Sequence, residues 1–516
     1  MFVDARSVPP GTVIETEVCI VGSGAAGITL AREFINSGFR VALLESGDVD
    51  FEEKTQNLYG GSNIGRRYFA PNDVGLRLRY FGGTTNHWGG WCAPLDPLDF
   101  EEREGLPHSG WPFSRDHLEP WYHRAQSVLQ LSAYGYAPVE WGIAPRDIPP
   151  PFNGPHFICQ ALQASTPVRF GPDYGPALRQ ASRITVYLNA NALHFETDES
   201  NRTVQTLAVG VLPDHRLNLR ARVYVLATGG IENARLLLLS GKEGANGLGN
   251  ANDLVGRFFM VHLEYPGGVI LLSDPFQNLK FSTGDEGATY VRSGALHKFV
   301  SYICLSDESR RKFRLPNLRI LFEKAFLQGV DRRGEILRNM QSAMSSLDGS
   351  AAIPLRNVQF ENVMPSATIP IHCSSEQMPN PDSRIALGAT VDAFGMRTVA
   401  VNWQLTAKDK QGVVAGHRLF GAEIGRAGFG RFWSSVPLDD VSWPIKMFGN
   451  QHNIGTTRMN KNAKLGVVDE NCRIHGVANL YVAGSSVFPT EGTANPTLTI
   501  VALALRLADH IKERLK

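Results

Sequence analysis

The residues that point most directly to chemistry are three glycines and one carboxylate near the N-terminus. Gly22 permits a tight turn after a strand, Gly24 lets the backbone approach a pyrophosphate without a Cβ, and Gly27 lets a helix pack closely on the strand. Glu45 follows about 20 residues later, where a carboxylate can accept hydrogen bonds from ribose hydroxyls. This spacing predicts a dinucleotide site. The alternative is an ordinary strand–turn–helix with a solvated Glu45.

The elements that must position these residues follow from the apolar runs around them. Residues 17–21 predict a buried strand, residues 28–38 a helix, and residues 41–44 a second strand that ends on Glu45. The start of the helix would offer unpaired N–H groups to phosphates. The other expected parts of this lobe are strands at 222–227 and 480–484 and helices at 232–240 and 497–516. One nucleotide-binding lobe is therefore expected from distant segments.

The middle of the chain has a different pattern. Residues 260–440 mix loops with alternating apolar runs, such as 267–272 and 399–403, which predict a second lobe with an antiparallel sheet. The turn-rich stretches 105–112 and 138–155 are expected to be connectors. The basic cluster at 310–314 is expected to lie in a solvated turn.

Composition excludes several classes of protein. Hydrophobic residues make up 43% of the 516, so a disordered chain is excluded, and 51 basic against 50 acidic residues give no electrostatic case for nucleic acid or an anionic membrane. No CxxC pair or His cluster indicates a zinc site or a disulfide framework, and no apolar run is long enough to span a membrane. The sequence predicts a soluble, cytoplasmic protein with six reduced cysteines, namely Cys19, Cys92, Cys159, Cys304, Cys373 and Cys472.

Several motifs together resemble the glucose–methanol–choline (GMC) family of FAD-dependent oxidoreductases. The most unusual are FGGTTNHWGG at 81–90 and HNIGTTRM at 452–459. GVVD at 466–469, NLYVAGS at 479–485 and GTANPT at 492–497 also match, in the order found in the family. The resemblance covers most of residues 15–260 and 370–516.

The resemblance implies FAD as cofactor, a two-lobed fold, and oxidation of an alcohol carbon by hydride transfer to flavin N5. The expected fold class is α/β (α+β overall), with a Rossmann-like FAD-binding lobe of discontinuous segments and a mainly antiparallel substrate lobe. The expected division is 1–110, 181–260 and 450–516 for the FAD lobe, 111–180 for a connector and lid, and 261–449 for the substrate lobe. The cofactor-binding residues that the resemblance implies are Gly22, Gly24, Ala26, Gly27, Glu45, Gly83, Thr84, Asn86, His87, Trp88, Ala192, Gly484, Ser485, Asn495 and Thr497.

The resemblance also assigns the catalytic pair, His452 and Asn495. A neutral histidine with a pKa near 6.5 suits the removal of a hydroxyl proton, and an asparagine N–H can steady the negative oxygen that forms. The alternatives are a core or helix-cap role for His452 and a turn role for Asn495. His262 is expected to support structure close to the flavin.

His87 has a more specific resemblance. The segment TNHW at 85–88 resembles the STHW segment of pyranose oxidases, whose histidine bonds covalently to the flavin 8-methyl carbon. Attachment through His87 and a noncovalent contact at the flavin edge are both open. The same loop favours a sugar, polyol or glycoside as substrate.

Two other functions remain open on the sequence alone. The family includes hydroxynitrile lyases that keep FAD without redox use, and a flavin subunit could pass electrons to a haem or quinone partner. The expected partners are a small-molecule alcohol and O₂, a quinone or another electron acceptor, without nucleic acid or direct membrane insertion; a partner subunit remains open. The sequence leaves open the substrate, the acceptor and the oligomeric state.

Overall fold

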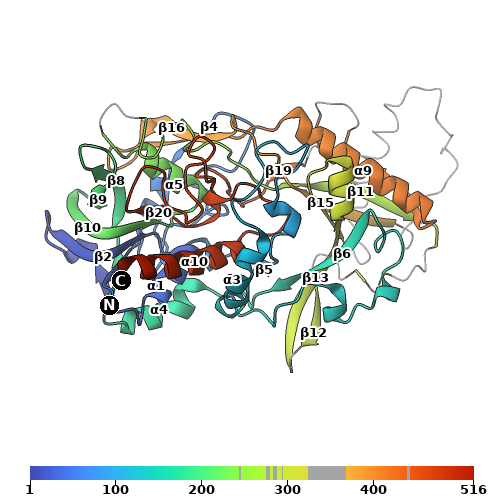
Figure 1. Cartoon of the computed structure of the whole chain (residues 1–516), viewed down its shortest axis with the longest axis horizontal. Helices are drawn as coiled ribbons and strands as arrows, with labels where there is room; N and C mark the ends of the chain where they lie inside the picture. Colours follow the sequence, from blue (N-terminus) through green and yellow to red (C-terminus); the bar gives the residue numbers. More distant parts are fainter. Residues whose placement is uncertain are drawn as a thin grey trace.

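The computed structural model describes residues 1–242, 246–274, 279, 281–282, 287–292, 294–323, 368–437, 442–444 and 446–516. Two lobes lie side by side along the long axis of the molecule (Figure 1). One lobe contains both termini and an eight-stranded sheet, and the other contains a nine-stranded sheet. The two-lobed α/β architecture expected from the sequence is confirmed.

The first sheet is built from distant segments of the chain. Its order is β1-β7-β3-β2-β10-β9-β8, with β20 beside β10. Val18 pairs with Val41 and Leu226 with Val482 in parallel register, and these strand ends are buried, as expected when both faces of a parallel sheet are covered. The strands are β1 Phe2–Asp4, β2 Val13–Val21, β3 Val41–Leu44, β7 Ile184–Leu188, β8 Asn191–Thr197, β9 Val204–Val211, β10 His215–Leu226 and β20 Leu480–Val482.

Helices cover both faces of this sheet. On one side lie α1 (Ala25–Glu33), α4 (Phe170–Gln180) and α10 (Thr497–Leu515), and α3 (Arg115–Val128) packs against α10. On the other side α5 (Gly229–Leu238) packs against a three-stranded sheet of β4 Gly61–Asn63, β16 Arg384–Val391 and β17 Arg397–Asn402 (Figure 1).

Two expectations about local structure were wrong. The first helix ends at Glu33 rather than Gly38, because Phe34 and Ile35 donate to carbonyls only three residues back, which tightens the helix end. The run at 399–403 does not join the second lobe's sheet. Its strand β17 pairs with β16 and β4 instead, since the antiparallel and parallel partners of Val399 are Leu387 and Gly61.

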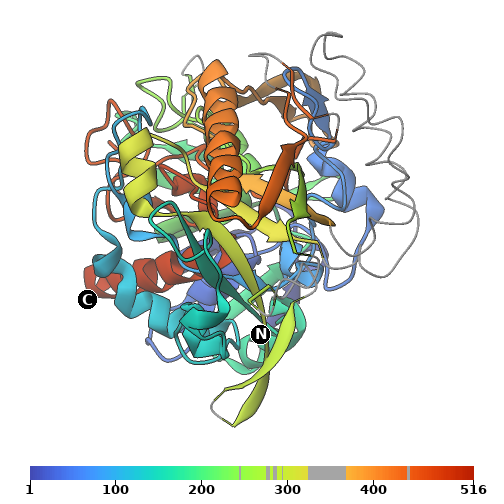
Figure 2. The same cartoon turned by 90° about the vertical axis from the view of Figure 1, so that its right-hand side faces the viewer.

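The second lobe is a mainly antiparallel sheet, as expected. Its order is β18-β11-β15-β14-β13-β6-β5, with β12 on β13 and β19 on β11. The strands are β5 Trp91–Cys92, β6 Phe157–Ala164, β11 Leu263–Leu272, β12 Ala288–Arg292, β13 Ala295–Leu305, β14 Leu318–Phe322, β15 Thr368–Ser375, β18 Gly430–Ser434 and β19 Phe448–Gly449. Helix α9 (Ala407–Arg426) packs on this lobe. The β12–β13 hairpin projects from the lobe (Figures 1 and 2).

The basic cluster at 310–314 is exposed at Arg311, Lys312 and Arg314, as expected, but it belongs to a helix and its C-cap rather than to a turn, and Arg310 is buried. The expectation was therefore wrong for Arg310. Arg310 lies in α6 (Asp307–Phe313), and its side chain is fully buried in ion pairs with Asp99 and, at 3.4 Å, with Asp96. Glu376 lies 4.0 Å away. A buried guanidinium requires such carboxylates, and these come from segments far away in the sequence.

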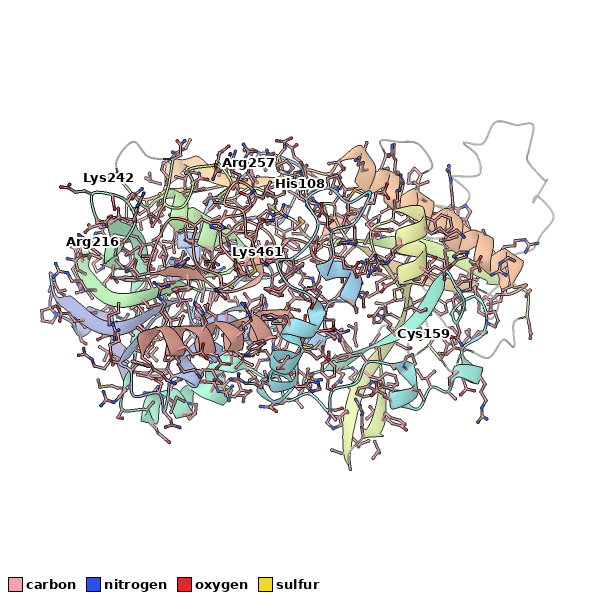
Figure 3. All side chains as sticks on the ribbon, viewed as in Figure 1. His108, Cys159, Arg216, Lys242, Arg257 and Lys461 are labelled. Atoms are coloured by element: carbon pink, nitrogen blue, oxygen red, sulfur yellow. The ribbon has the colours of Figure 1, made fainter. Side chains whose placement is uncertain are left out.

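Other sequence features can be located directly. All six cysteines are free and buried; Cys159, on β6, is marked in Figure 3. Within the described ranges, no helix has the length and apolar character needed to cross a bilayer. The same ranges hold no group of three or more His, Cys, Asp or Glu side chains that could bind a metal ion. The division into five segments stays a prediction, and part of 261–449 lies outside the described residues.

Candidate active site

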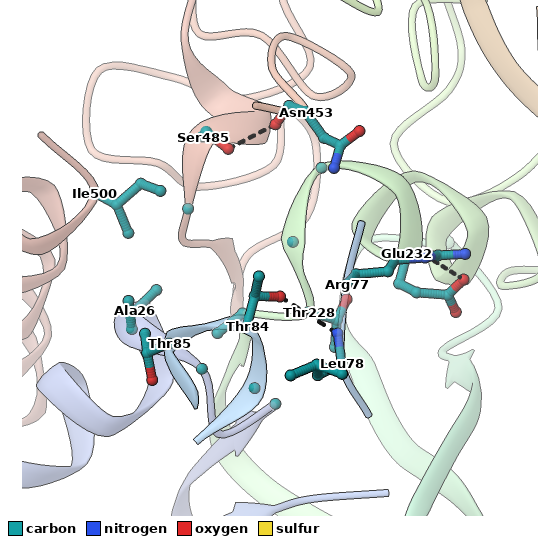
Figure 4. Close-up of a pocket in the computed structure, with 18 of the residues that line it drawn as sticks. Ala26, Arg77, Leu78, Thr84, Thr85, Thr228, Glu232, Asn453, Ser485 and Ile500 are labelled. Carbon is teal, nitrogen blue, oxygen red and sulfur yellow. Dashed lines mark hydrogen bonds and ion pairs between the residues drawn. The ribbon is translucent and has the colours of Figure 1, made fainter. Parts of the chain in front are cut away.

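A cavity of about 550 Å³ is lined mainly by residues of the lobe that contains both termini. The turn after β2, the loop at 75–91, the start of α5, the loop at 451–453 and the start of α10 all contribute to its wall (Figure 4). The sequence-predicted residues on this wall are Gly22, Gly24, Ala26, Glu45, Gly83, Thr84, His87, Trp88, Ala192, His452, Gly484, Ser485, Asn495 and Thr497. Gly27 and Asn86 do not line it.

Glycines shape the floor of the cavity. At Gly24, Gly229 and Gly484 an added Cβ would meet no atom within 4 Å, and all three line the cavity. A side chain at these positions would therefore project into the cavity itself. Gly27 differs, because its Cβ would lie 1.8 Å from the carbonyl oxygen of Gly22. It allows α1 to pack against the turn and does not face a ligand.

Glu45 is buried at the end of β3 and fixes the turn that carries these glycines. Its Oε2 accepts hydrogen bonds from Ser23 N at 3.1 Å and Ser23 Oγ at 2.6 Å, and its Oε1 accepts one from Gly47 N at 3.1 Å. Each carboxylate oxygen can accept more than one hydrogen bond, so capacity for ribose hydroxyls remains.

A buried ionic group on the wall was not anticipated from the sequence. Arg77 and Arg79 lie 3.1 and 3.7 Å from Glu232, and both guanidiniums stack on Tyr59. Burial raises the pKa of Glu232, but the guanidiniums of Arg235, Arg77 and Arg79 bring it to about 2. Nε and Nη1 of Arg79 are buried without a hydrogen-bond partner among the described residues. These N–H groups fit an acceptor-rich ligand such as FAD. In the sequence, the only signal for them is the pair of basic residues just before the glycine loop.

The loop that follows Gly83 presents His87 to the cavity. Asn86 Nδ2 donates to Phe81 O at 2.9 Å, and Trp88 Nε1 donates to Val168 O at 2.7 Å, so the two neighbours of His87 fix the loop. Burial and Arg169 lower the pKa of His87, which keeps its imidazole neutral at pH 7. No hydrogen bond within the described part of the chain occupies its ring nitrogens.

His452 is held against the second lobe. Its loop follows β19, which pairs with β11, so His452 faces His262, the residue directly before β11. The two Nδ1 atoms are 2.8 Å apart, and Asn450 Nδ2 lies 2.8 Å from the same nitrogen of His452. Burial, the nearby His262 and Arg319 lower the pKa of His452 well below 6.5, against an opposing effect of Glu264. The imidazole is therefore a neutral base, weaker than the unperturbed histidine expected from the sequence.

The hydrogen-bond partners of His262 assign the tautomer of His452. His262 Nε2 lies 3.1 Å from the carbonyl oxygen of Gly492, which can only accept, so Nε2 carries the hydrogen. Burial, and to a lesser extent the charge of Arg319, lowers the pKa of His262 to about 4, so its Nδ1 is an acceptor at neutral pH. The assignment that satisfies both contacts of His262 puts a hydrogen on Nδ1 of His452. Asn450 Nδ2 donates to Glu264 at 3.1 Å and then meets this N–H group as a second donor, 2.8 Å away. His452 Nε2 is then left with a free lone pair.

Asn495 lies directly before α10 on the same cavity wall. Its Oδ1 accepts a hydrogen bond from Arg319 Nη1 at 3.0 Å. Pro496 caps α10, so the positive end of that helix also faces the cavity. The structure thus brings a lone-pair nitrogen and an amide to one cavity, although 42 residues separate them in the sequence.

Three other charged or titratable residues, His372, Asp382 and Arg384, lie outside this wall. His372 Nε2 bonds Glu264 at 2.8 Å, behind the histidine pair. Asp382 is exposed, and Arg384 pairs with Asp253 at 3.2 Å. Sequence reasoning missed Glu264, Asn450 and Arg319, because none belongs to a recognisable motif.

Comparisons with known proteins agree with this geometry. A family model described as FAD dependent oxidoreductase matches residues 17–299, and one described as GMC oxidoreductase matches residues 379–504. The 6'''-hydroxyparomomycin C oxidase of Streptomyces lividus is 25% identical, over 98% of this chain and 93% of its own. The fructose dehydrogenase large subunit of Gluconobacter japonicus is 24% identical, over 98% and 99%. The crystal structure of pyridoxine 4-oxidase from Mesorbium loti superposes with a TM-score of 0.58 at 17% identity, over 96% of this chain and 99% of that one.

Proposed function

Because this chain is an FAD-dependent oxidoreductase of the GMC family acting on CH–OH groups, we propose that it oxidises a secondary alcohol on a sugar, polyol, glycoside or secondary metabolite. The observation that carries the proposal is the pairing of a free imidazole lone pair, on His452 Nε2, with the Asn495 carboxamide on one cavity wall. The names of two full-length relatives, a 6'''-hydroxyparomomycin C oxidase and a fructose dehydrogenase large subunit, support a polyhydroxylated substrate.

The residues that would hold FAD are those of the glycine floor and its surroundings. Gly24 and the start of α1 suit the pyrophosphate, and Glu45 suits a ribose. The N–H groups of Arg79 that make no hydrogen bond within the described part of the chain suit an acceptor on the cofactor. Gly484 and the loop at 83–88 would lie along the flavin half. When bound, FAD supplies the acceptor for a hydride from the alcohol carbon.

The chain's own residues supply the proton chemistry. His452 Nε2 takes the hydroxyl proton, and His262 Nδ1 accepts the hydrogen bond from the imidazolium that results. Asn495 Nδ2 donates to the substrate oxygen as its negative charge grows. Loss of the proton and stabilisation of the oxygen together favour departure of the hydride.

The direct test is anaerobic mixing of the holoenzyme with a panel of alcohols. D-fructose, sorbitol, methyl glucoside and paromomycin are expected to include at least one that bleaches the flavin within seconds, whereas a simple primary alcohol such as ethanol does not. The flavin absorbance measures the reduction. Absence of bleaching with every polyhydroxylated compound, at saturating concentration, would exclude the proposal and favour the FAD-retaining lyase alternative.

A second candidate concerns the acceptor. The relative from Gluconobacter japonicus is named a large subunit, which favours a flavin subunit that donates electrons to a partner. Reoxidation of the bleached protein in air identifies an oxidase. Reoxidation by a quinone but not by air identifies a dehydrogenase, with or without a partner subunit.

Covalent attachment of FAD through His87 is part of the proposal. Its neutral, hydrogen-bond-free ring on the cavity wall supports attachment. Acid precipitation of the wild-type protein is expected to leave the yellow chromophore in the pellet, while His87→Ala releases it into the supernatant. Complete release from the wild-type protein would establish a noncovalent contact instead.

A further inference from the structure

Arg319 is a buried cation from the substrate lobe that reaches the catalytic pair. Its side chain is 7% exposed, and its Nη2 lies 3.8 Å from Glu264 Oε1, in addition to the bond with Asn495. Arg319 on β14 is opposite Ser374 on β15, and Ser374 is opposite Glu264 on β11. The cation and the carboxylate therefore occupy one row across three adjacent strands. The sheet of one lobe thereby fixes a guanidinium against a residue of the other lobe.

This contact decides which end of the Asn495 carboxamide faces the cavity. Arginine has only donors, so the amide atom beside Arg319 must be the oxygen. Nδ2 then points away from Arg319, and no acceptor among the described residues binds it. A carboxamide free to rotate could present its oxygen instead, which would repel a developing alkoxide. The charged donor also polarises the amide, which strengthens its N–H as a donor.

We propose that Arg319 is a positioning residue that holds the Asn495 carboxamide with its N–H group directed at the substrate oxygen. The inference rests on the proposed function, since it gives Asn495 the role of hydrogen-bond donor. This role explains why the buried cation of Arg319 lies next to Asn495, a catalytic residue that carries no charge. Glu264 balances the charge of Arg319 and holds Asn450, which lies beside His452.

The test compares Arg319→Met with wild-type holoenzyme in anaerobic flavin reduction by the best alcohol of the panel. The maximal rate is expected to fall roughly tenfold to a hundredfold, the range for loss of a hydrogen bond to a charged group. Because the lost contact acts mainly in the transition state, KM should stay nearly constant. Arg319→Lys, which keeps a donor-only cation, is expected to recover part of the rate, and Arg319→Gln, whose amide is too short to reach Asn495, is not.

Two controls separate positioning from a merely structural role. Arg311→Met removes an arginine of α6 whose side chain is 55% exposed and paired with Glu101, away from the cavity wall, and it should leave the rate unchanged. Each variant is first checked for FAD content and melting temperature; should Arg319→Met fail to bind FAD, Arg319→Gln takes its place. Arg319 also lowers the pKa of His452, so the comparison is made at pH 8, where that imidazole is neutral with or without the cation. In an Asn495→Ala background at this pH, loss of the Arg319 side chain should cause no further decrease, since its remaining effect passes through Asn495.

The outcomes distinguish the inference from the function on which it rests. An Arg319→Met rate equal to wild type, or an effect of equal size with and without Asn495, overturns the inference alone. A wild-type rate in Asn495→Ala overturns the assigned role of Asn495 as well. Slow reduction in both single variants, without a further decrease in the double variant, supports both.

Discussion

Alanine in place of His452 is expected to slow reduction of the bound flavin by about 10²- to 10⁴-fold, the usual contribution of a positioned general base. The structure gives the reason. His262 Nδ1 accepts a hydrogen bond from His452 Nδ1, so the free lone pair of Nε2 is the group that removes the substrate proton. Stopped-flow absorbance after anaerobic mixing with the best alcohol of the panel measures the rate.

The control is His123→Ala, since that imidazole is 56% exposed on α3, away from the cavity wall. This variant should reduce its flavin at the wild-type rate.

The rate of the wild-type enzyme should also depend on pH in a defined direction. Because burial lowers the pKa of His452, its neutral form persists below pH 6.5, and kcat/KM should fall only in more acidic solution. A His452→Ala protein with full FAD content and near-native turnover would refute the assigned role.

Replacement of Gly24 by valine is expected to abolish FAD binding while the fold survives. The φ and ψ angles of Gly24, −78° and −164°, suit any residue, and its Cβ would meet no protein atom within 4 Å. The valine side chain would therefore project into the space that suits the pyrophosphate. The purified variant should be folded, as judged by far-UV circular dichroism. It should also be colourless, with no FAD bound after incubation with excess cofactor.

A matched control for this change is Gly154→Val. Gly154 also lacks a positive φ, its Cβ would lie 3.6 Å from Pro151 O, and it does not line the cavity. This variant should bind FAD as the wild type does. A yellow Gly24→Val protein with wild-type affinity for FAD would show that the cofactor does not approach this turn.

Short-range patterns in the sequence identified the elements of the nucleotide-binding lobe. Gly22, Gly24 and Gly27 lie within six residues of one another, so the strand, the turn and the helix that they require depend on local conformation. The same holds for the buried runs of β3, β10 and β20. The end of α1 was placed too late, because apolar residues after Glu33 continue into a tighter turn with hydrogen bonds to carbonyls three residues back.

The candidate site residues were predicted from motifs that resemble a known family. These motifs are the loop at 83–88 and the segments around His452 and Asn495. The neighbours that control their chemistry gave no such signal. Arg319 lies in an ordinary strand, and Glu264 reads as one polar residue in an apolar run. Arg310 lies among exposed basic residues in the sequence, so its burial could not be predicted from them.

What the sequence by itself determined is therefore the set of local turns, strands and motif residues, because each depends on side chains close to one another along the chain. Only the tertiary structure decided which nitrogen of His452 is free, which end of Asn495 faces the cavity, and which carboxylates neutralise Arg310. Each of these depends on a contact between residues far apart in the chain: 190 residues for His262 and His452, 176 for Arg319 and Asn495, and 211 for Arg310 and Asp99. Burial then makes those contacts decisive, since water cannot replace a missing partner.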